Sequence, residues 1–210
     1  MDGYRLYVST GPNPRIVRMF AAEKGLSLPE IEVDIGAGEN RQAPFLALNP
    51  AGETPALGCP DGQVLGEATV ICELLEELAG GPRLLGETPL ERALIRAWVR
   101  RVDLKVAQPF TGGFRFGPAL SFFRPRIRTM PQASDDLFTL TREGLAWIEG
   151  QAAGRPYLAG PDLSLADIQL YCFLSFNAER VKRPLTDGLT WIPDWFARMD
   201  ARPSADATRR

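Results

Sequence analysis

The elements that the sequence predicts change in kind after residue 80. In residues 1–80, short apolar runs alternate with longer stretches of helical spacing, in the order β-α-β-α-β-β-α. Beyond this point every periodic stretch has helical spacing. Such a change predicts an α/β domain followed by an all-α domain. We therefore expect domains at residues 1–80 and 89–210, joined by a linker at 81–88.

Turn and capping residues set the limits of these elements. Pro14 lies near the start of the first predicted helix and Gly25 follows its end, while Gly80 and Gly81 close the last helix of the first half. We predict strands at 4–9 and 30–35, a β-hairpin at 54–66, and helices at 13–25, 44–49, 67–80, 90–110, 133–151, 164–177 and 192–201.

The chain contains no histidine, which removes Ser-His-Asp and Cys-His catalysis and most zinc sites. Cys59, Cys72 and Cys172 form no C-x-x-C pair, so neither a dithiol motif nor a disulfide framework is indicated. We expect three buried thiols and no bound metal.

The net charge and the hydropathy pattern exclude two classes of partner. A net charge of −2 is not the cationic excess that nucleic-acid binding requires. The opening MDGYRLYVST has no signal-peptide pattern, and no apolar run is long enough for a membrane span. We expect a cytoplasmic protein that binds neither nucleic acid nor membrane.

A proline stands where the strand of NPAGETPAL begins. The residues from Thr54 to Leu57 have strand character, yet Pro55 has no N–H to donate to a ladder. One interpretation is an edge strand or a loop. The other is a cis proline that turns the backbone of Thr54 toward a ligand.

Further along, the segment LSLADI has the pattern of a helix start. The hydroxyl of Ser164 can accept from the N–H of Asp167, whose carboxylate can reach back to the N–H of Ser164. This capping box predicts a folding role for Asp167 in place of a catalytic one.

Taken in order, NPAGETPAL, EATVICELLEEL, YLAGPDLSLADIQLYC and WFARMDARPSA resemble the cytosolic glutathione transferase superfamily, and among its members the bacterial type with a Ser/Thr/Asn turn. The resemblance implies a thioredoxin-like N-terminal domain, a helical C-terminal domain and a homodimer. It also implies glutathione as co-substrate and conjugation to a small apolar electrophile. Two alternatives stay open: glutathione-dependent peroxide or disulfide reduction, and a non-catalytic binding protein of the same fold.

The resemblance also implies where glutathione binds. The backbone of Thr54, beside Pro55, is expected to pair with the cysteinyl part as a short added strand. Glu67 and Ala68 open the helix after the hairpin, where free N–H groups and the helix dipole favour the γ-glutamyl carboxylate. Relatives usually carry Ser at the position of Ala68, so one hydroxyl donor is lost here.

Asn40 and Arg41 fall where relatives hold the glycyl carboxylate, and the planar guanidinium of an arginine suits that group. Glu53 stands where many relatives carry Lys or Gln, so its charge opposes the same carboxylate. Ala68 and Glu53 are the departures that make a non-catalytic member credible.

The segment YVSTGPNPR is expected to supply the donor that keeps the glutathione sulfur ionised. The resemblance favours Thr10 with Asn13 assisting, and Ser9 second. An ungapped match to the tyrosine-type classes would select Tyr7, although a tyrosine inside a predicted strand is more often a packing residue. The segment has no cysteine, which argues against the mixed-disulfide branch of the superfamily.

Aromatic residues for the second substrate are concentrated in QPFTGGFRFGPALSFFRPR. Glycine pairs and prolines interrupt this segment, so we expect no regular helical spacing in it. Some of its phenylalanines are expected to line an apolar pocket. The candidates are Phe110, Phe114, Phe116, Phe122 and Phe123.

Overall fold

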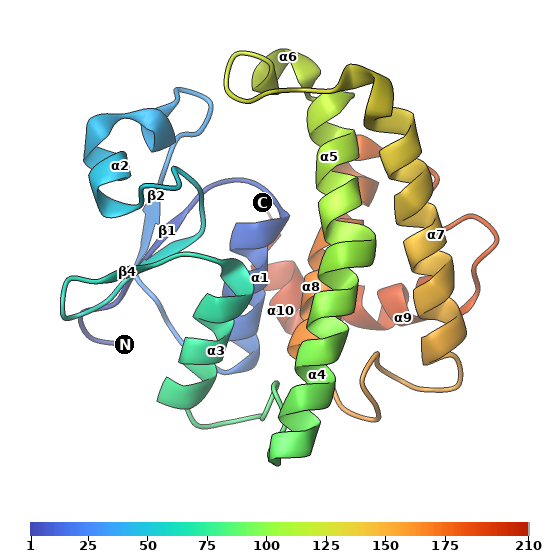
Figure 1. Cartoon of the computed structure of the whole chain (residues 1–210). Helices are drawn as coiled ribbons and strands as arrows, with labels where there is room; N and C mark the ends of the chain where they lie inside the picture. Colours follow the sequence, from blue (N-terminus) through green and yellow to red (C-terminus); the bar gives the residue numbers. More distant parts are fainter. Residues whose placement is uncertain (210) are drawn as a thin grey trace. The chain divides into compact units, whose positions relative to one another are not determined.

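The computed structural model describes residues 1–209, which form two compact units (Figure 1). The first unit contains residues 1–85 and 201–209, and the second contains residues 86–200. No helix in the described part of the chain is long and apolar enough to cross a membrane.

The first unit is built on a sheet of strand order β2-β1-β3-β4. Its strands are β1 (Arg5–Val8), β2 (Glu30–Glu32), β3 (Ala56–Gly58) and β4 (Val64–Leu65). β1 runs parallel to β2 and antiparallel to β3, with Leu6 opposite Leu57. Both leucines are buried, so the apolar core of this unit lies against the two central strands.

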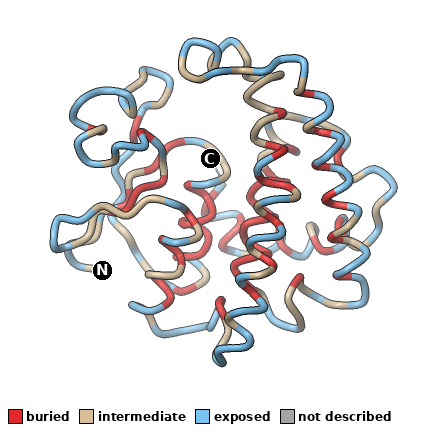
Figure 2. The backbone as a smooth tube through the Cα atoms, in the orientation of Figure 1, coloured by how far each residue is buried: buried red, intermediate tan, exposed pale blue. Residues whose placement is uncertain are grey.

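Helices α1 (Pro12–Glu23) and α3 (Ala68–Leu78) pack on each other and carry most of the helical core of this unit. The turn η1 (Glu39–Arg41) and α2 (Ala43–Leu48) are mostly exposed, as Figure 2 shows for this part of the chain. The predicted β-α-β-α-β-β-α order is confirmed, and with it the thioredoxin-like fold.

A buried ion pair links the C-terminal ends of α1 and α3. The Lys24 ammonium lies 2.7 Å from a Glu76 carboxylate oxygen and also donates to the carbonyl of Pro82 at 2.9 Å. The second Glu76 oxygen accepts from the N–H of Leu85 at 3.3 Å. Because both charges are buried and paired, they hold the two helices and the following segment together.

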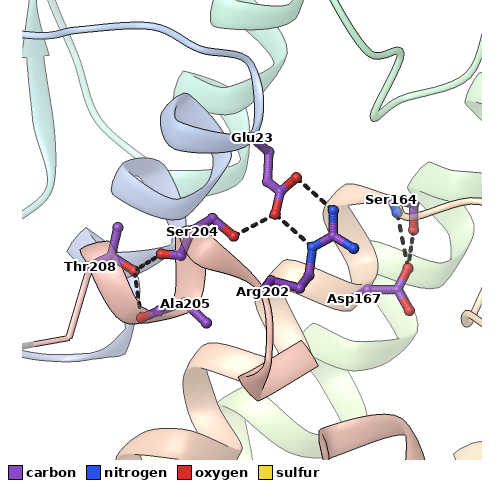
Figure 3. Close-up of polar contacts among 7 residues, drawn as sticks. All are labelled: Glu23, Ser164, Asp167, Arg202, Ser204, Ala205 and Thr208. Carbon is purple, nitrogen blue, oxygen red and sulfur yellow. Dashed lines mark hydrogen bonds and ion pairs between the residues drawn. The ribbon is translucent and has the colours of Figure 1, made fainter. Parts of the chain in front are cut away.

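The last residues of the chain join the first unit and not the helical domain expected at residues 89–210. Arg202 donates to both carboxylate oxygens of Glu23 on α1, at 2.7 and 2.8 Å (Figure 3). Ser204 donates to the same carboxylate, and Arg15 donates to the carbonyl of Ala205 at 3.0 Å. Burial acts to raise the pKa of Glu23, but Arg202 and Ser204 together lower it. A forked arginine on a carboxylate therefore attaches α10 (Pro203–Ala207) to α1.

The second unit is helical throughout, as predicted. Thr88 and Glu91 form a capping box at the start of its first helix. The helices are α4 (Pro89–Val102), α5 (Gln108–Phe116), α6 (Leu120–Phe123), α7 (Ser134–Ala152), α8 (Leu165–Phe176) and α9 (Trp191–Asp200), with π-helical turns η2 (Asp103–Ala107) and η4 (Asn177–Val181) and a 3-10 turn η3 (Pro131–Ala133).

The glycine pair that was expected to interrupt helical spacing lies inside α5 instead. A Cβ added at Gly112 would lie 3.0 Å from a methyl carbon of Leu137, and one at Gly113 would lie 3.1 Å from the ring of Phe138. Both neighbours belong to α7. The glycines thus serve close packing of two helices, and the expectation that helical spacing is interrupted is wrong for residues 111–116.

Asp167 is fully buried at the start of α8, where the predicted capping box is present. One carboxylate oxygen accepts from the N–H and the hydroxyl of Ser164, at 3.1 and 2.7 Å (Figure 3). The other accepts from the N–H of Leu158 at 2.9 Å and from the indole N–H of Trp195 at 3.0 Å. Burial raises the pKa of Asp167, while these four hydrogen bonds oppose the rise. Asp167 therefore joins α8, the preceding loop and α9.

A second carboxylate caps α9 from a neighbouring helix. Glu149 on α7 accepts from the N–H groups of Thr190 and Ile192, at 2.7 and 3.1 Å. Partial burial acts to raise the pKa of Glu149, but these backbone donors lower it overall. This cap supplies an acceptor to N–H groups that no residue within α9 itself can satisfy.

We expect Asp167→Ala to lower the free energy of unfolding by about 3 kcal/mol, because buried donors at Leu158 and Trp195 lose their acceptor. Activity per folded molecule should change little. Thermal melting together with assays on the folded fraction checks this, and normal melting with lost activity would contradict the folding role.

We expect Glu149→Gln to lower the free energy of unfolding by about 1 kcal/mol at neutral pH. Folding lowers the pKa of Glu149. The carboxylate therefore contributes fully to the free energy of unfolding above its pKa in the unfolded chain, which is about 4.3. This contribution is lost as the pH falls through the lower pKa of the folded protein. The two proteins should therefore become equally stable at low pH.

Urea unfolding of both proteins at pH 7 and pH 3 measures this difference. Glu143→Gln, at an exposed position of the same helix, is the matched control. A difference that stays constant across this pH range would contradict the capping role of the Glu149 carboxylate.

Candidate functional site

The predicted glutathione-binding residues all belong to the first unit, in the turn after β1, around η1, before β3 and at the start of α3. The Thr54–Pro55 peptide bond is cis, as one of the two interpretations predicted. The edge-strand interpretation is wrong, because β3 pairs with β1 on one side and with β4 on the other. Its ladder begins at Ala56, so Thr54 precedes the paired residues.

Ser9 and Thr10 are adjacent in the chain but face different surroundings. Ser9 is 3% exposed, and its hydroxyl lies 2.5 Å from the hydroxyl of Thr54. Thr10 is exposed. The Ser9 side chain therefore holds the end of β1 to the residue before Pro55, and Thr10 is the hydroxyl available to a bound molecule.

The start of α1 offers few backbone donors. Pro12 and Pro14 have no N–H, which leaves Asn13 as the donor among these opening positions. Gly11 precedes the helix with φ +131°, and a Cβ there would meet nothing within 4 Å. Asn13 is exposed, as is Thr10.

Tyr7 has the contacts of a packing residue. It lies in β1 opposite Ala56, and its ring meets that of Phe45 edge to face with the centroids 6.1 Å apart. A Cβ added at Gly58 would lie 3.5 Å from the Tyr7 ring. The ring is partly buried against β3 and α2, which supports a structural role.

Asn40 and Arg41 differ in the same way as Ser9 and Thr10. The side-chain amide of Asn40 donates to the carbonyl of Gly52 at 2.7 Å. Gly52 has φ +63°, and a Cβ there would lie 2.9 Å from the Asn40 carbonyl oxygen, so this turn requires glycine. Arg41 is exposed, and within residues 1–209 its side chain makes no hydrogen bond or ion pair, while its backbone N–H donates to the carbonyl of Gly38 at 2.9 Å. The guanidinium of Arg41 is thus available, and the amide of Asn40 already closes a loop.

Glu67 has an uncommon backbone conformation at the start of α3, with φ +64° and ψ +110°. A positive φ is strained for a residue with a long side chain, and such outliers gather at functional positions. Glu67 is exposed and its side chain does not cap the helix, whereas Ala68 is buried. The first N–H groups of α3 are therefore left without a side-chain acceptor.

The candidate aromatic residues of the second unit divide into core and partly exposed groups. Phe110 is 2% exposed and meets the rings of Phe138 and Phe173 edge to face, so it belongs to the helical core. Phe114 meets Phe123 with centroids 6.2 Å apart, and both rings are partly exposed. Phe116 and Phe122 are partly exposed as well.

Some functional features had no signal in the sequence. Neither the pairing of Ser9 with Thr54 nor the backbone conformation of Glu67 can be read from neighbouring residues.

In the described part of the chain, no group of three or more Cys, Asp or Glu side chains could hold a metal ion.

Known proteins match both units of the chain. A model of the glutathione S-transferase N-terminal domain matches residues 10–78, and one of the C-terminal domain matches residues 114–203. Glutathione S-transferase 2 of Saccharomyces cerevisiae is 31% identical over 201 residues, which cover 92% of this chain and 84% of the relative.

A solved structure and a second curated relative agree with these matches. The crystal structure of Gtt2 from Saccharomyces cerevisiae superposes with a TM-score of 0.90 at 30% identity, covering 98% of this chain and 100% of that one. A maleylacetoacetate isomerase of Pseudomonas aeruginosa is 43% identical over 182 residues, covering 86% of this chain and 82% of the relative. With both units matched in order and over most of their length, the chain belongs to the glutathione S-transferase family, as a glutathione S-transferase with a thioredoxin-like unit and a helical unit.

Proposed function

We propose that this enzyme binds glutathione on its first unit, holds it as the thiolate and transfers it to a small apolar electrophile. The observation that carries the proposal is the start of α3, where Glu67 has a strained backbone and the first N–H groups have no side-chain acceptor. A helix start of this kind favours a carboxylate, as in the γ-glutamyl group, and the exposed Glu67 carboxylate is suited to the neighbouring ammonium.

The rest of the tripeptide would use groups that the fold leaves free. Thr54 precedes the β3 ladder, so its backbone groups are suited to the cysteinyl part of glutathione. Arg41 supplies a guanidinium for the glycyl carboxylate, while Asn40 shapes the loop beside it. Glu53 is also exposed, and its negative charge weakens this end of the site.

Thr10 and Asn13 are the proposed donors to the thiolate. A thiol of this kind has a pKa of about 8.5, so a fall of about two units, equal to about 2.7 kcal/mol, makes it mostly ionised at neutral pH. Thr10 and Asn13 are exposed, whereas the hydroxyl of Ser9 is engaged by Thr54. We therefore rank Ser9 behind them, as a residue that supports the turn.

We also propose that the protein is a homodimer in which α3 and α4 contact the second copy. Large apolar side chains are exposed on both helices: Val70 and Leu78 on α3, and Leu90 and Leu94 on α4. Leu90 and Leu94 are one helical turn apart and so share a face. A face of this kind in water favours burial against a partner.

We expect the wild-type enzyme to be retained on immobilised glutathione and to conjugate it to an aryl halide. Thr10→Val should raise the pKa of the bound thiol by about one unit, because a hydroxyl donor to the sulfur is lost. Conjugation should then slow about fivefold at pH 6.5 and little at pH 9, where the thiol ionises unaided. Titration of the thiolate absorbance near 240 nm measures the pKa directly.

Ser9→Ala and Asn13→Ala should give smaller shifts in the same direction, because donors to one charged atom need not add. Tyr7→Phe is the matched control, since it removes a hydroxyl and keeps the ring that packs on Phe45. A large shift for Tyr7→Phe with none for Thr10→Val would reject the proposed donor. Absence of both retention and conjugation in the wild type would instead favour a non-catalytic protein.

We expect sedimentation to give a dimer for the wild type at micromolar concentration. Leu94→Arg should give a monomer, because it places a charge on the apolar face of α4. Met130→Arg, at an exposed apolar residue outside both helices, is the control and should remain dimeric. A wild-type monomer, or a dimer that tolerates Leu94→Arg, would reject this contact.

A further inference from the structure

The chain from Leu104 to Ser134 contains no aspartate or glutamate. Its cations are Lys105, Arg115, Arg124, Arg126 and Arg128. The whole protein has a net charge of −2, so this segment differs in sign from the rest of the chain. A local excess of positive charge of this kind favours a negatively charged partner.

Two of these arginines lie over phenylalanine rings. The guanidinium carbon of Arg126 is 3.5 Å from the centroid of Phe122, and that of Arg115 is 5.2 Å from the centroid of Phe123. The rings of Phe122 and Phe123 meet each other edge to face, with centroids 4.9 Å apart. The structure thus brings two aromatic rings and two guanidinium groups together on α5, α6 and the turn that follows α6.

We call the surface formed by Phe122, Phe123, Arg115, Arg124, Arg126 and Arg128 the Phe–Arg surface. It is at least partly exposed to solvent. Every residue from Phe114 to Ala133 is at least partly exposed, and Figure 2 shows α6 and the chain beyond it without buried stretches. Arg124 and Arg128 are exposed, and neither of them nor Arg115 has a carboxylate partner within residues 1–209. Their charge is therefore not neutralised by the described chain.

Two of the three acidic residues nearest in sequence are paired with arginines outside the segment from Leu104 to Ser134. Asp103 pairs with Arg100 at 2.7 Å, and Asp135 pairs with Arg183 at 2.9 Å. Asp136 is exposed in the first turn of α7, where the helix dipole favours its charge. Neither paired carboxylate is free to neutralise the arginines of α5 and α6.

We infer that this Phe–Arg surface binds a small aromatic compound that carries a carboxylate or sulfonate, and that the electrophile of this enzyme belongs to that class. The phenylalanine rings offer an apolar surface to an aromatic ring. An arginine stacked on a ring keeps its N–H donors in the plane of the guanidinium, where they can meet an anionic group edge on. Only the second half of this inference, on the electrophile, rests on the proposed function.

The binding half can be measured without catalysis. The measurement is calorimetry on the wild-type protein in the absence of glutathione. We expect 3,5-dinitrobenzoate to bind at least about tenfold more tightly than the neutral 3,5-dinitrobenzamide. A ratio of this size is typical of a charge-assisted contact. The combined variant Arg115→Gln, Arg126→Gln and Arg128→Gln, which removes both stacked guanidinium groups, should remove this preference and leave the affinity for the amide within about twofold.

Two further variants distinguish a lost contact from a change in folding. The corresponding triple change to lysine keeps the charge and should restore part of the preference for the acid. Arg142→Gln, at an exposed arginine of α7, should leave the preference intact. Equal binding of acid and amide to the wild type, or a preference that survives the glutamine variant, would overturn the inference.

The second half of the inference, on the electrophile, is tested with two reactive compounds, 4-chloro-3,5-dinitrobenzoate and its amide. Their shapes resemble those of the two compounds used in calorimetry. In each reaction the glutathione thiolate forms a C–S bond at the ring carbon that bears chlorine, and chloride leaves with the electron pair of the C–Cl bond. For the wild-type enzyme we expect kcat/KM to be about tenfold higher with the acid than with the amide, because KM for the acid is lower. The glutamine variant should show no such difference.

The two measurements separate the inference from the proposed function. Preference for the acid in calorimetry, with no conjugation of either compound, would contradict the proposed transferase reaction and would still support the binding surface. Conjugation of both compounds at equal rates would support the transferase reaction and reject the anionic electrophile.

Discussion

The buried ion pair of Lys24 and Glu76 is the interaction on which the candidate site depends most. It joins the C-terminal ends of α1 and α3, and the opposite ends of these helices carry Asn13 and Glu67. Removal of one partner would leave an uncompensated buried charge, a change that costs about 3–5 kcal/mol in proteins. Because the same two side chains also bond to Pro82 and Leu85, the pair fixes both helices and the chain that leaves the first unit.

Within the first unit, neighbouring polar residues serve either the fold or the site. Ser9 is held by Thr54, Asn40 by the carbonyl of Gly52, and the Tyr7 ring by Phe45. Thr10, Asn13 and Arg41 are exposed in the same segments. The first group determines where the backbone of the site lies, and the second provides the groups that a tripeptide can reach. Under the proposed function, a chain without histidine would bind and activate a thiol through hydroxyl, amide and backbone donors of this second group.

The two units contribute different chemistry to the proposed reaction. The first unit offers a strained helix start, an unpaired backbone segment before β3 and an exposed arginine, which suit a charged tripeptide. The second offers partly exposed phenylalanines with arginines stacked on them, which suit an aromatic anion. Substitutions on the Phe–Arg surface should therefore alter selectivity for the electrophile while the binding of glutathione is retained.

Local patterns in the sequence were sufficient to predict the order of the elements and the capping box at Ser164. Each depends on residues within a few positions of one another, so periodicity and capping rules determine them. The tertiary structure alone decided the attachment of Arg202 to Glu23, the pairing of Ser9 with Thr54 and the helical conformation at Gly112 and Gly113. The first two join residues 179 and 45 positions apart in the chain, and the third depends on side chains of α7. Local propensity carries no information about such partners, because only the folded chain brings them into contact.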